Sequence, residues 1–219
     1  IVVGNLAEAC ANSIGARSLL CRVGAYYHDV GKIVMPEYFI ENQFTGENKH
    51  DSLTPNMSAK TIRNHVKEGV SLGREYGIPK IIRDFIPMHH GTTRVEFFYR
   101  KALETASDPD DVDENAFRYP GPKPDTKETG ILMICEAVEA AVRSIKNPDV
   151  MKIEAMIDKI IKGRVDDGQL DECPLTLGEL TKIKGEVDGA MGMLPVLRGI
   201  YHIRVEYPDD QKEGTSGQS

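Results

Sequence analysis

The stretch RVGAYYHDVGKIVMP, residues 22–36, places an imidazole and a carboxylate next to each other where a helix is expected to end. Apolar residues recur at helical spacing up to this point, and Gly31 is the residue type that most often follows a helix terminus. His28 and Asp29 therefore stand at the edge of a hydrophobic core. Two ionisable groups at such a position need partners, and the rest of the chain must supply them.

Helical spacing of apolar residues continues nearly throughout, which predicts an all-α fold in one domain. Thr54 is the expected N-cap of one helix and Pro55 its first residue. The segments 36–54 and 107–127 are expected to be loops, and the second is long enough to be a functional lid or disordered. The helices are expected to lie up to Tyr27 and over 55–76, 79–91, 93–106, 128–147, 149–163 and 176–194.

The end of the chain is expected to lie outside this helical core. YHIRVEYP, residues 201–208, alternates like a strand but has no second strand with which to pair. The polar residues 208–219 are expected to be disordered, so the folded domain is predicted to cover 1–207.

Composition limits the classes of function. The 219 residues carry a net charge of −7, which argues against a polymeric nucleic acid partner but not against a small anion bound by local cations. Four cysteines form no CxxC pair, which predicts buried thiols and a reducing cytosol. No apolar run is long enough to cross a membrane. The chain begins within a predicted helix and without Met, so we expect it to be part of a longer protein.

Several ionisable residues fall on apolar helix faces. His65 shares its stripe with Ile62 and Val66, and His89 follows an apolar stripe and is adjacent to His90. A lone histidine on such a face is more often a hydrogen-bonded core residue than a ligand, but a pair at a helix end has no structural explanation. A carboxylate in the apolar helix 128–147, Glu136, needs a metal ion or a buried cation.

These side chains form one candidate ligand set: His28, Asp29, His65, His89, His90 and Glu136. Imidazole and carboxylate together suit divalent Mn, Fe or Zn. Six ligands are too many for one ion that keeps positions open for a substrate, so they favour two ions sharing a carboxylate. Such dinuclear sites chiefly perform in-line displacement at phosphorus, with a metal-bridging hydroxide as the attacking group.

At these residues the sequence resembles the HD-domain metal-dependent phosphohydrolases. GAYYHDVGK, PEYFIENQ, NKHDSLTP, HHGT, FRYPGPKP and VEAAVRS occur in this order over residues 1–145. The ordered set is similar to the cytoplasmic HD domain of the seven-transmembrane HD family, the PgpH-type cyclic di-AMP phosphodiesterases. The resemblance implies an HD-domain helical bundle around a dinuclear metal site.

The resemblance also implies a reaction, a cofactor and a location. Members hydrolyse cyclic di-AMP to the linear dinucleotide pApA with two Fe or Mn ions, and transmembrane helices hold the domain at the cytoplasmic face of the bacterial membrane. Carried over by position, His28 and Glu136 bind the first metal and Asp29 bridges both. The second metal is bound by His65, His89 and His90.

Two features depart from the family pattern. The first histidine ligand of the family belongs to an HS pair that would lie two residues upstream of Ile1. The family usually has Asp where this chain has Glu136, which displaces the carboxylate by about one C–C bond, roughly 1.5 Å. Both features favour a competing hypothesis, a receptor domain that binds a cyclic dinucleotide without cleaving it.

Residues outside the metal set are candidates for contact with the substrate. Lys32 either binds phosphate or complements a helix C-terminus. His50 is either a general acid or a hydrogen-bonding loop residue, and with Asp29 and Lys32 it completes the predicted catalytic set. The predicted substrate-binding residues, which alternatively anchor their loops, are Asn42, Gln43, Arg118, Tyr119 and Lys123.

We therefore expect a cyclic di-AMP phosphodiesterase. The same enzyme class acting on another nucleotide, such as cyclic di-GMP, stays open because base contacts cannot be read from the sequence. The pattern is also compatible with a homodimer.

Overall fold

The computed structural model describes residues 1–43, 48–185 and 191–201, and they form a helical structure. Within these ranges the single β-type pairing is an isolated antiparallel bridge between Arg94 and Arg118. The prediction of an all-α fold is therefore confirmed. Most of the strand-like segment 201–208 and the whole predicted disordered tail 208–219 lie outside the described residues.

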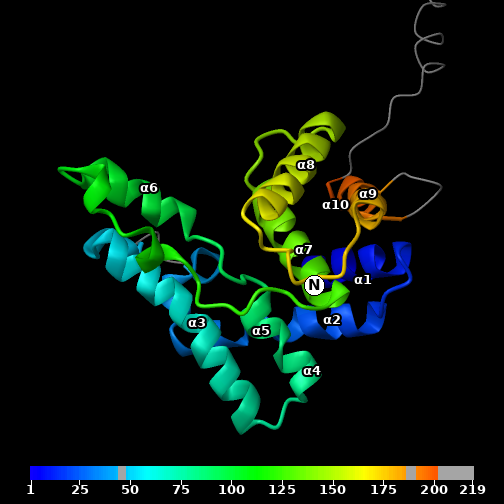
Figure 1. Ribbon diagram of the computed structural model, residues 1–219, viewed down its shortest axis with the longest axis horizontal. Helices are drawn as coiled ribbons and strands as arrows, with labels where there is room; N and C mark the ends of the chain where they lie inside the picture. Colours follow the sequence, from blue (N-terminus) through cyan, green and yellow to red (C-terminus); the bar gives the residue numbers. More distant parts are fainter. Residues whose placement is uncertain (44–47, 186–190, 202–219) are drawn as a thin grey trace, which may run out of the picture.

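Helix α7, Lys127–Arg143, is the centre of the main bundle (Figure 1). It is apolar on almost every side, and its residues from Ile131 to Cys135 are fully buried. Helices α1, Val2–Ser13, and α2, Ser18–Tyr27, pack on it and on each other. The predicted central helix at 128–147 is thus confirmed, although it ends four residues early.

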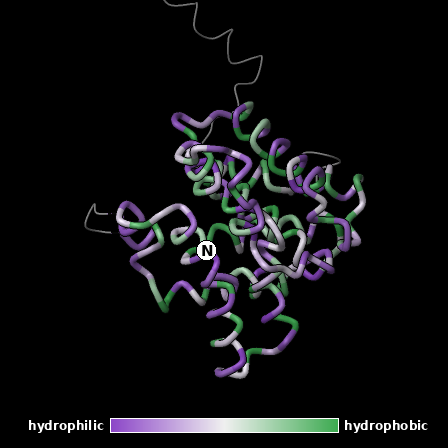
Figure 2. Tube along the Cα trace, turned by 60° about the vertical axis from the view of Figure 1, so that its left-hand side comes forward, coloured by the Kyte–Doolittle hydropathy of each residue, from purple (hydrophilic) through white to green (hydrophobic). Residues whose placement is uncertain are grey.

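Three helices from the second half of the chain complete the main bundle. Helix α8, Val150–Asp166, packs on α7, while α9, Leu177–Lys184, and α10, Met193–Ile200, pack on α1. One helix over 176–194 was the wrong prediction, because Gly185 has a φ of 107°, a conformation that ends the helix. Figure 2 shows hydrophobic segments where these helices meet and hydrophilic ones in the outer turns.

The predicted helix at 79–91 is divided into two. Helix α4 spans Lys80–Arg83 and α5 spans Phe85–Met88. Pro87 has no backbone N–H for the Arg83 carbonyl, and its ring crowds that group, which breaks the helix at this point. The predicted caps of the preceding helix α3, Pro55–Glu75, are confirmed: Thr54 Oγ1 accepts a bond from Met57 N at 3.3 Å.

Helix α6, Glu96–Thr105, begins three residues later than predicted. The residues before it pair instead with the turn η6, Glu114–Phe117, and the residues that follow: Val95 N donates to Phe117 O, and Tyr119 N donates to Thr93 O, both at 2.9 Å. The segment 107–127 is thus packed rather than disordered. It includes a second short turn, η5, Pro109–Asp111.

A second, smaller hydrophobic cluster holds this region together. It contains Ala59 of α3, Phe98 and Ala102 of α6, and Phe117, and it is separate from the cluster inside the main bundle. In Figure 1 the region of α3 and α6 lies to one side of the bundle. Residues 1–43, 48–185 and 191–201 therefore form two separate apolar clusters.

The described parts of the predicted loop 36–54 form short 3₁₀ turns. These turns are η2, Pro36–Tyr38, η3, Ile40–Asn42, and η4, Lys49–Ser52. A further 3₁₀ turn, η1, Val30–Val34, comes before them. The four cysteines are buried and free, as predicted. Among the described helices, none combines the length and the apolarity needed to span a bilayer.

Candidate metal centre and its surroundings

Three separate parts of the chain bring four histidines and one aspartate together. His28 and Asp29 follow α2, His65 belongs to α3, and His89 and His90 form the turn after α5. Asp29 Oδ2 lies 3.1 Å from His28 Nε2. Asp29 Oδ1 lies 3.4 Å from His65 Nε2 and 3.6 Å from His89 Nε2. We call these five residues the His–Asp cluster.

A close approach of two backbones allows this geometry. A Cβ atom on Gly31 would lie 1.9 Å from the carbonyl oxygen of His65 and 2.4 Å from Gly69 N. Only glycine leaves room for η1 to lie against α3 at this distance. The glycine that the sequence marks as a helix stop therefore also brings Asp29 to His65.

Backbone carbonyls fix the orientation of three imidazoles. His28, His65 and His89 each donate an Nδ1–H bond to the carbonyl oxygen three residues earlier, at 2.7, 2.6 and 2.6 Å. In the neutral form of each ring this bond leaves the lone pair on Nε2, which is the tautomer a metal ligand needs. The three Nε2 atoms all face Asp29.

The electrostatics favour the metal-binding forms of His89, His90 and Asp29. His28 differs: burial alone would lower its pKa, but the hydrogen bond and charge of Asp29 outweigh burial and raise it. Burial, assisted by the charges of neighbouring histidines, holds the pKa of both His89 and His90 well below the usual value, so both are neutral at pH 7. Burial alone would raise the pKa of Asp29, but the hydrogen bond and charge of His28 outweigh it and keep that pKa well below normal. Neutral imidazole and ionised carboxylate are the states that coordinate cations.

The donor set fits a metal ion. Asp29 Oδ1 is buried, yet no hydrogen-bond donor reaches it from any residue that the structure describes. Two groups of ligand atoms, each within 4.8 Å of one another, are His65, His89 and His90, and His28, Asp29 and His89. A buried carboxylate oxygen without a donor is costly unless a cation completes it. The cluster is therefore able to hold metal.

Glu136 of α7 lies at the edge of the same site. It lines a cavity of about 280 Å³ together with His28, Asp29 and Lys32. Burial, followed by the charge of Asp29, raises the pKa of Glu136. The start of α1 borders the same cavity, which Ile1 also lines.

Of the other predicted catalytic residues, one is beside the cluster and one is not. Lys32 Nζ lies 2.8 Å from Asp29 Oδ2 and 2.7 Å from Glu41 Oε1. His50 instead has its Nε2 bonded to Tyr38 O at 2.9 Å, and its ring centroid lies 4.9 Å from that of Phe98. Tyr38 belongs to the loop 36–54 and Phe98 to α6, so these contacts of His50 are with neither the cluster nor Lys32.

The predicted substrate-binding residues are similarly divided. Tyr119 is buried and stacks on His90, with ring centroids 4.1 Å apart and planes inclined by 19°. Arg118 donates to Thr92 O at 2.9 Å, two residues beyond His90. Asn42, Gln43 and Lys123 lie further out: Asn42 ends η3, Gln43 donates to the backbone of the same loop, and Lys123 Nζ is 3.8 Å from Asp171.

Two polar residues of the surroundings were missed at the level of sequence. Gln169 is buried, and its Oε1 accepts a hydrogen bond from Thr92 N at 2.9 Å. This bond attaches the turn that contains His90 to the segment that follows α8. Arg164 lies one turn earlier on α8, and its charge acts on Glu136. The signal available was the polar run RVDDGQ, residues 164–169, directly after the helix predicted over 149–163; α8 itself extends to Asp166.

An all-helical bundle with histidines and an aspartate gathered at one buried point defines a metal-binding HD domain. The family model described as HD domain matches residues 1–141, so this chain belongs to that family, and the resemblance predicted from sequence is confirmed. The cyclic-di-AMP phosphodiesterase PgpH of Listeria monocytogenes is 49% identical over 96% of the chain, and that of Bacillus subtilis is 45% identical over 97%. The crystal structure of the L. monocytogenes phosphodiesterase PgpH HD domain in complex with cyclic-di-AMP superposes with a TM-score of 0.84 at 48% identity, covering 94% of this chain and 91% of that one.

The relatives are much longer than this chain. The chain spans 28% of the L. monocytogenes protein and 29% of the B. subtilis protein. The similarity therefore concerns one domain of those proteins.

Proposed function

We propose that this chain is a metal-dependent phosphodiesterase domain that hydrolyses cyclic di-AMP to pApA. The observation that carries the proposal is the convergence of the cluster imidazoles on the buried Asp29 Oδ1, which has no donor among the described residues. The substrate is supported by the similarity to an HD domain crystallised with cyclic-di-AMP, at 48% identity over 94% of this chain.

Two divalent ions, Mn or Fe, are the proposed cofactors. His28, Asp29 and Glu136 are the proposed ligands of one ion, and His65, His89 and His90 are the proposed ligands of the other, with Asp29 shared. When bound, such ions supply Lewis-acid charge for the phosphoryl oxygens and an activated water as nucleophile. The Nδ1 bonds of three of the histidines keep Nε2 aimed inward before any ion arrives.

The chain adds its own positive charge to the site. Lys32 Nζ, 2.8 Å from Asp29 Oδ2, is proposed to bind a substrate phosphate, since it lines the same cavity as His28 and Glu136. Asn42, Gln43, Arg118 and Lys123 are proposed as outer contacts.

The structure changes how two predicted roles, those of Tyr119 and His50, are proposed. The face of the Tyr119 ring is already occupied by His90, so we propose that Tyr119 orients His90 rather than stacking on adenine. A general-acid role for His50 requires the loop 36–54 to move, because His50 Nε2 is bonded to Tyr38 O.

The longer relatives support a proposal about the parent protein. We propose that the HD domain covers residues 1–207 and is attached to transmembrane helices at the cytoplasmic face of the membrane. A further histidine ligand two residues before Ile1 is also proposed, and the position of Ile1 on the wall of the metal cavity supports it.

The test is product analysis. The chain is loaded with Mn under anaerobic conditions and incubated separately with cyclic di-AMP and cyclic di-GMP, and the products are separated by chromatography. We expect pApA to form, and Asp29→Ala to abolish its formation. Intact cyclic di-AMP in the presence of two metals per chain would reject catalysis in favour of the receptor hypothesis. Preferential cleavage of cyclic di-GMP would reject the substrate.

A further inference from the structure

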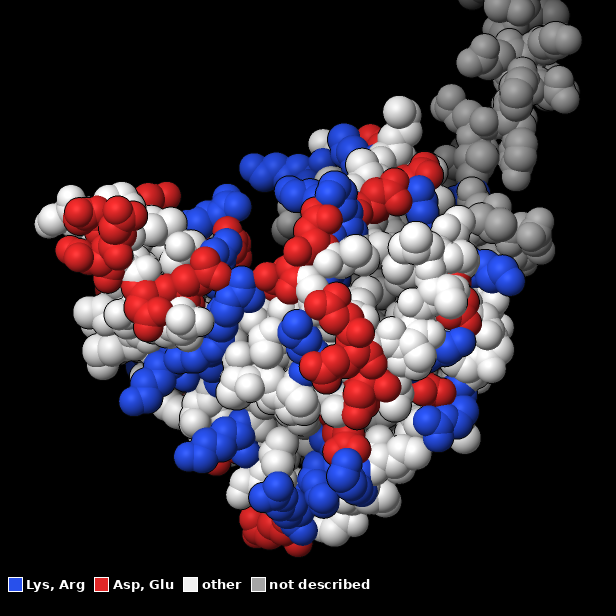
Figure 3. Space-filling view, in the orientation of Figure 1, with Lys and Arg blue, Asp and Glu red and all other residues white. Residues whose placement is uncertain are grey.

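A second cavity, of about 370 Å³, lies between α6 and α8 and is not part of the metal centre. We call it the α6–α8 groove. In Figure 3 it is a hollow between the two lobes of the molecule, with basic and acidic side chains on both sides. The volume is within the range of small-molecule sites. Its charged lining residues are Arg94, Glu96, Arg118, Lys159, Arg164 and Asp167.

The groove adjoins the His–Asp cluster. Thr93 lines it and donates its Oγ1 hydrogen to His90 O at 2.7 Å. At the other wall, Arg164 lines the groove, and its charge acts on the pKa of Glu136, which lines the metal cavity. The wall of the groove that Thr93 provides therefore contacts the backbone of the cluster directly.

Two of the four cations in the groove already have carboxylate partners. Arg94 lies 2.8 Å from Glu96 and 3.0 Å from Glu114. Arg118 lies 2.7 Å from Glu114 and 2.9 Å from Asp167. Both guanidinium groups are held in place and largely neutralised by these pairs.

Arg164 differs from them. Its Nε is buried, and nothing in the part of the chain that the structure describes accepts a bond from it; Glu136 and Asp167 act on its guanidinium through their charges but form no ion pair with it. A buried guanidinium nitrogen without an acceptor is costly to keep. The position has the chemistry of an anion site, because a phosphate diester would supply the missing acceptors.

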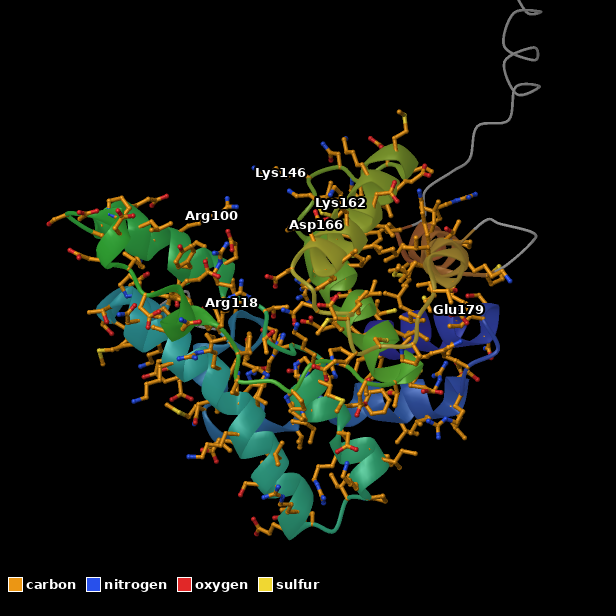
Figure 4. The ribbon with its side chains drawn as sticks, in the orientation of Figure 1. Arg100, Arg118, Lys146, Lys162, Asp166 and Glu179 are labelled. Carbon is orange, nitrogen blue, oxygen red and sulfur yellow. The ribbon has the colours of Figure 1, made fainter. Side chains whose placement is uncertain are left out.

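Further cations lie at the mouth of the groove, and two of them are in ion pairs. Figure 4 places Arg100 of α6 on one side of the opening and Lys146 and Lys162 on the other; Arg100 lies 2.6 Å from Glu96 and Lys162 2.5 Å from Asp166. Lys159, which lines the groove, is exposed and has no ion-pair partner among the residues described. In a chain with a net charge of −7, a local excess of cations marks a surface for an anionic ligand.

A cyclic dinucleotide carries two phosphodiester groups, and only one can be at the metal centre at a time. We infer that Arg164 binds the second, uncleaved phosphodiester in the α6–α8 groove. This inference rests on the proposed function. It makes the groove the part of the site that distinguishes a dinucleotide from a simple diester.

The test compares a substrate with two diesters to one with a single diester. Arg164→Gln, Arg164→Lys and a control on the same helix, Lys152→Gln, are assayed with Mn on cyclic di-AMP and on bis(p-nitrophenyl) phosphate. For Arg164→Gln we expect kcat/KM on cyclic di-AMP to fall at least about tenfold more than on the single diester, which is the loss expected for one charged hydrogen bond. Arg164→Lys retains the charge and recovers part of this loss, while Lys152→Gln behaves as wild type.

A binding measurement gives a readout apart from turnover. Calorimetric titration of cyclic di-AMP into the metal-depleted chain should show at least about tenfold weaker binding for Arg164→Gln. Equal losses on both substrates, with less Mn bound, would assign Arg164 to the support of Glu136 and overturn the inference. If Arg164→Gln does not fold, the test uses Arg164→Lys and compares its loss in kcat/KM on cyclic di-AMP with its loss on the single diester. A wild-type chain that cleaves only the single diester would instead reject the proposed function.

Discussion

Glu136 is a partly buried carboxylate that α7 places on the wall of the metal cavity, next to the His–Asp cluster. Burial and the charge of Asp29 raise its pKa, so without metal it is held in an unfavourable environment. We predict that Glu136→Asp retains two Mn ions per chain and activity within about tenfold of wild type, because a monodentate ligand tolerates a small displacement.

The matched variant removes the charge at nearly constant shape. Glu136→Gln should lose one Mn per chain by elemental analysis and reduce hydrolysis at least about a hundredfold. Retention of both ions in Glu136→Gln would exclude Glu136 from the ligand set.

A second carboxylate stabilises the fold rather than the site. Glu128, near the start of α7, accepts bonds from Arg17 N at 3.1 Å and Arg17 Nε at 3.0 Å. Burial alone would raise its pKa, but the bonds from Arg17 outweigh burial and lower it. The charged form therefore stabilises the folded state above pH 4.5, and this stabilisation is lost as the pH falls through the lower pKa of the folded state.

The corresponding prediction concerns Glu128→Gln. Its free energy of unfolding should be about 1 kcal/mol lower than that of wild type at pH 7, a small value because Arg17 is largely exposed. The difference should shrink steadily below pH 4.5. Urea titrations of both proteins with chelator, from pH 3.5 to 7.5, measure it. A difference that is constant over this range would contradict the assigned cause.

The residues that sequence reasoning identified share a visible anomaly. His65, His89 and Glu136 are polar residues at apolar helix positions, so spacing alone marks them. Arg164 and Gln169 lie in a polar run that spans the end of α8, where polar residues are ordinary. Gln169 is 77 residues from its partner Thr92, and such a contact has no local signal.

At the scale of elements, the existence of helices was predictable and their limits were not. The breaks at Pro87 and Gly185 have local causes that the residue types carry. The late start of α6 does not, because Val95 is held outside the helix by a bond to Phe117 O, 22 positions along the chain. Tertiary hydrogen bonding therefore decides that boundary.

The contact of η1 with α3 gives a prediction at this scale. Gly31→Ala places a Cβ atom 1.9 Å from His65 O, and neither backbone can yield without displacing Asp29 from His65. We expect a loss of about 3 kcal/mol or more in stability, together with weaker Mn binding. Thermal and urea unfolding measure the first effect, and metal titration measures the second.

The control for this variant is Gly199→Ala in α10. A Cβ atom there meets nothing within 4 Å, so the substitution should stabilise the chain by about 0.5 kcal/mol through the helix propensity of Ala. If Gly31→Ala is as stable as Gly199→Ala, the backbone contact does not hold the site together.

At the scale of the whole molecule, the metal centre connects the end of α2, helix α3 and the turn after α5. Removing metal leaves Asp29 Oδ1 buried without a donor among the described residues. We predict that chelation lowers the midpoint of thermal unfolding by about 5–10 °C, the shift expected for a ligand near a hundred times its Kd. Mn should restore the midpoint, whereas Ca should not, because an imidazole-rich site disfavours it. Full recovery with Ca would contradict the proposed ligand set.

The two hydrophobic clusters have a consequence for how such a domain changes over evolutionary time. The main bundle contains α7 and α1, whereas the smaller cluster is built on α3, α6 and Phe117. The wall of the α6–α8 groove that α6 provides is thus packed independently of the bundle. Substitutions on the α6 wall therefore leave the packing of the main bundle unchanged, so the shape of the groove can vary over evolutionary time while α7 and α1 keep their contacts.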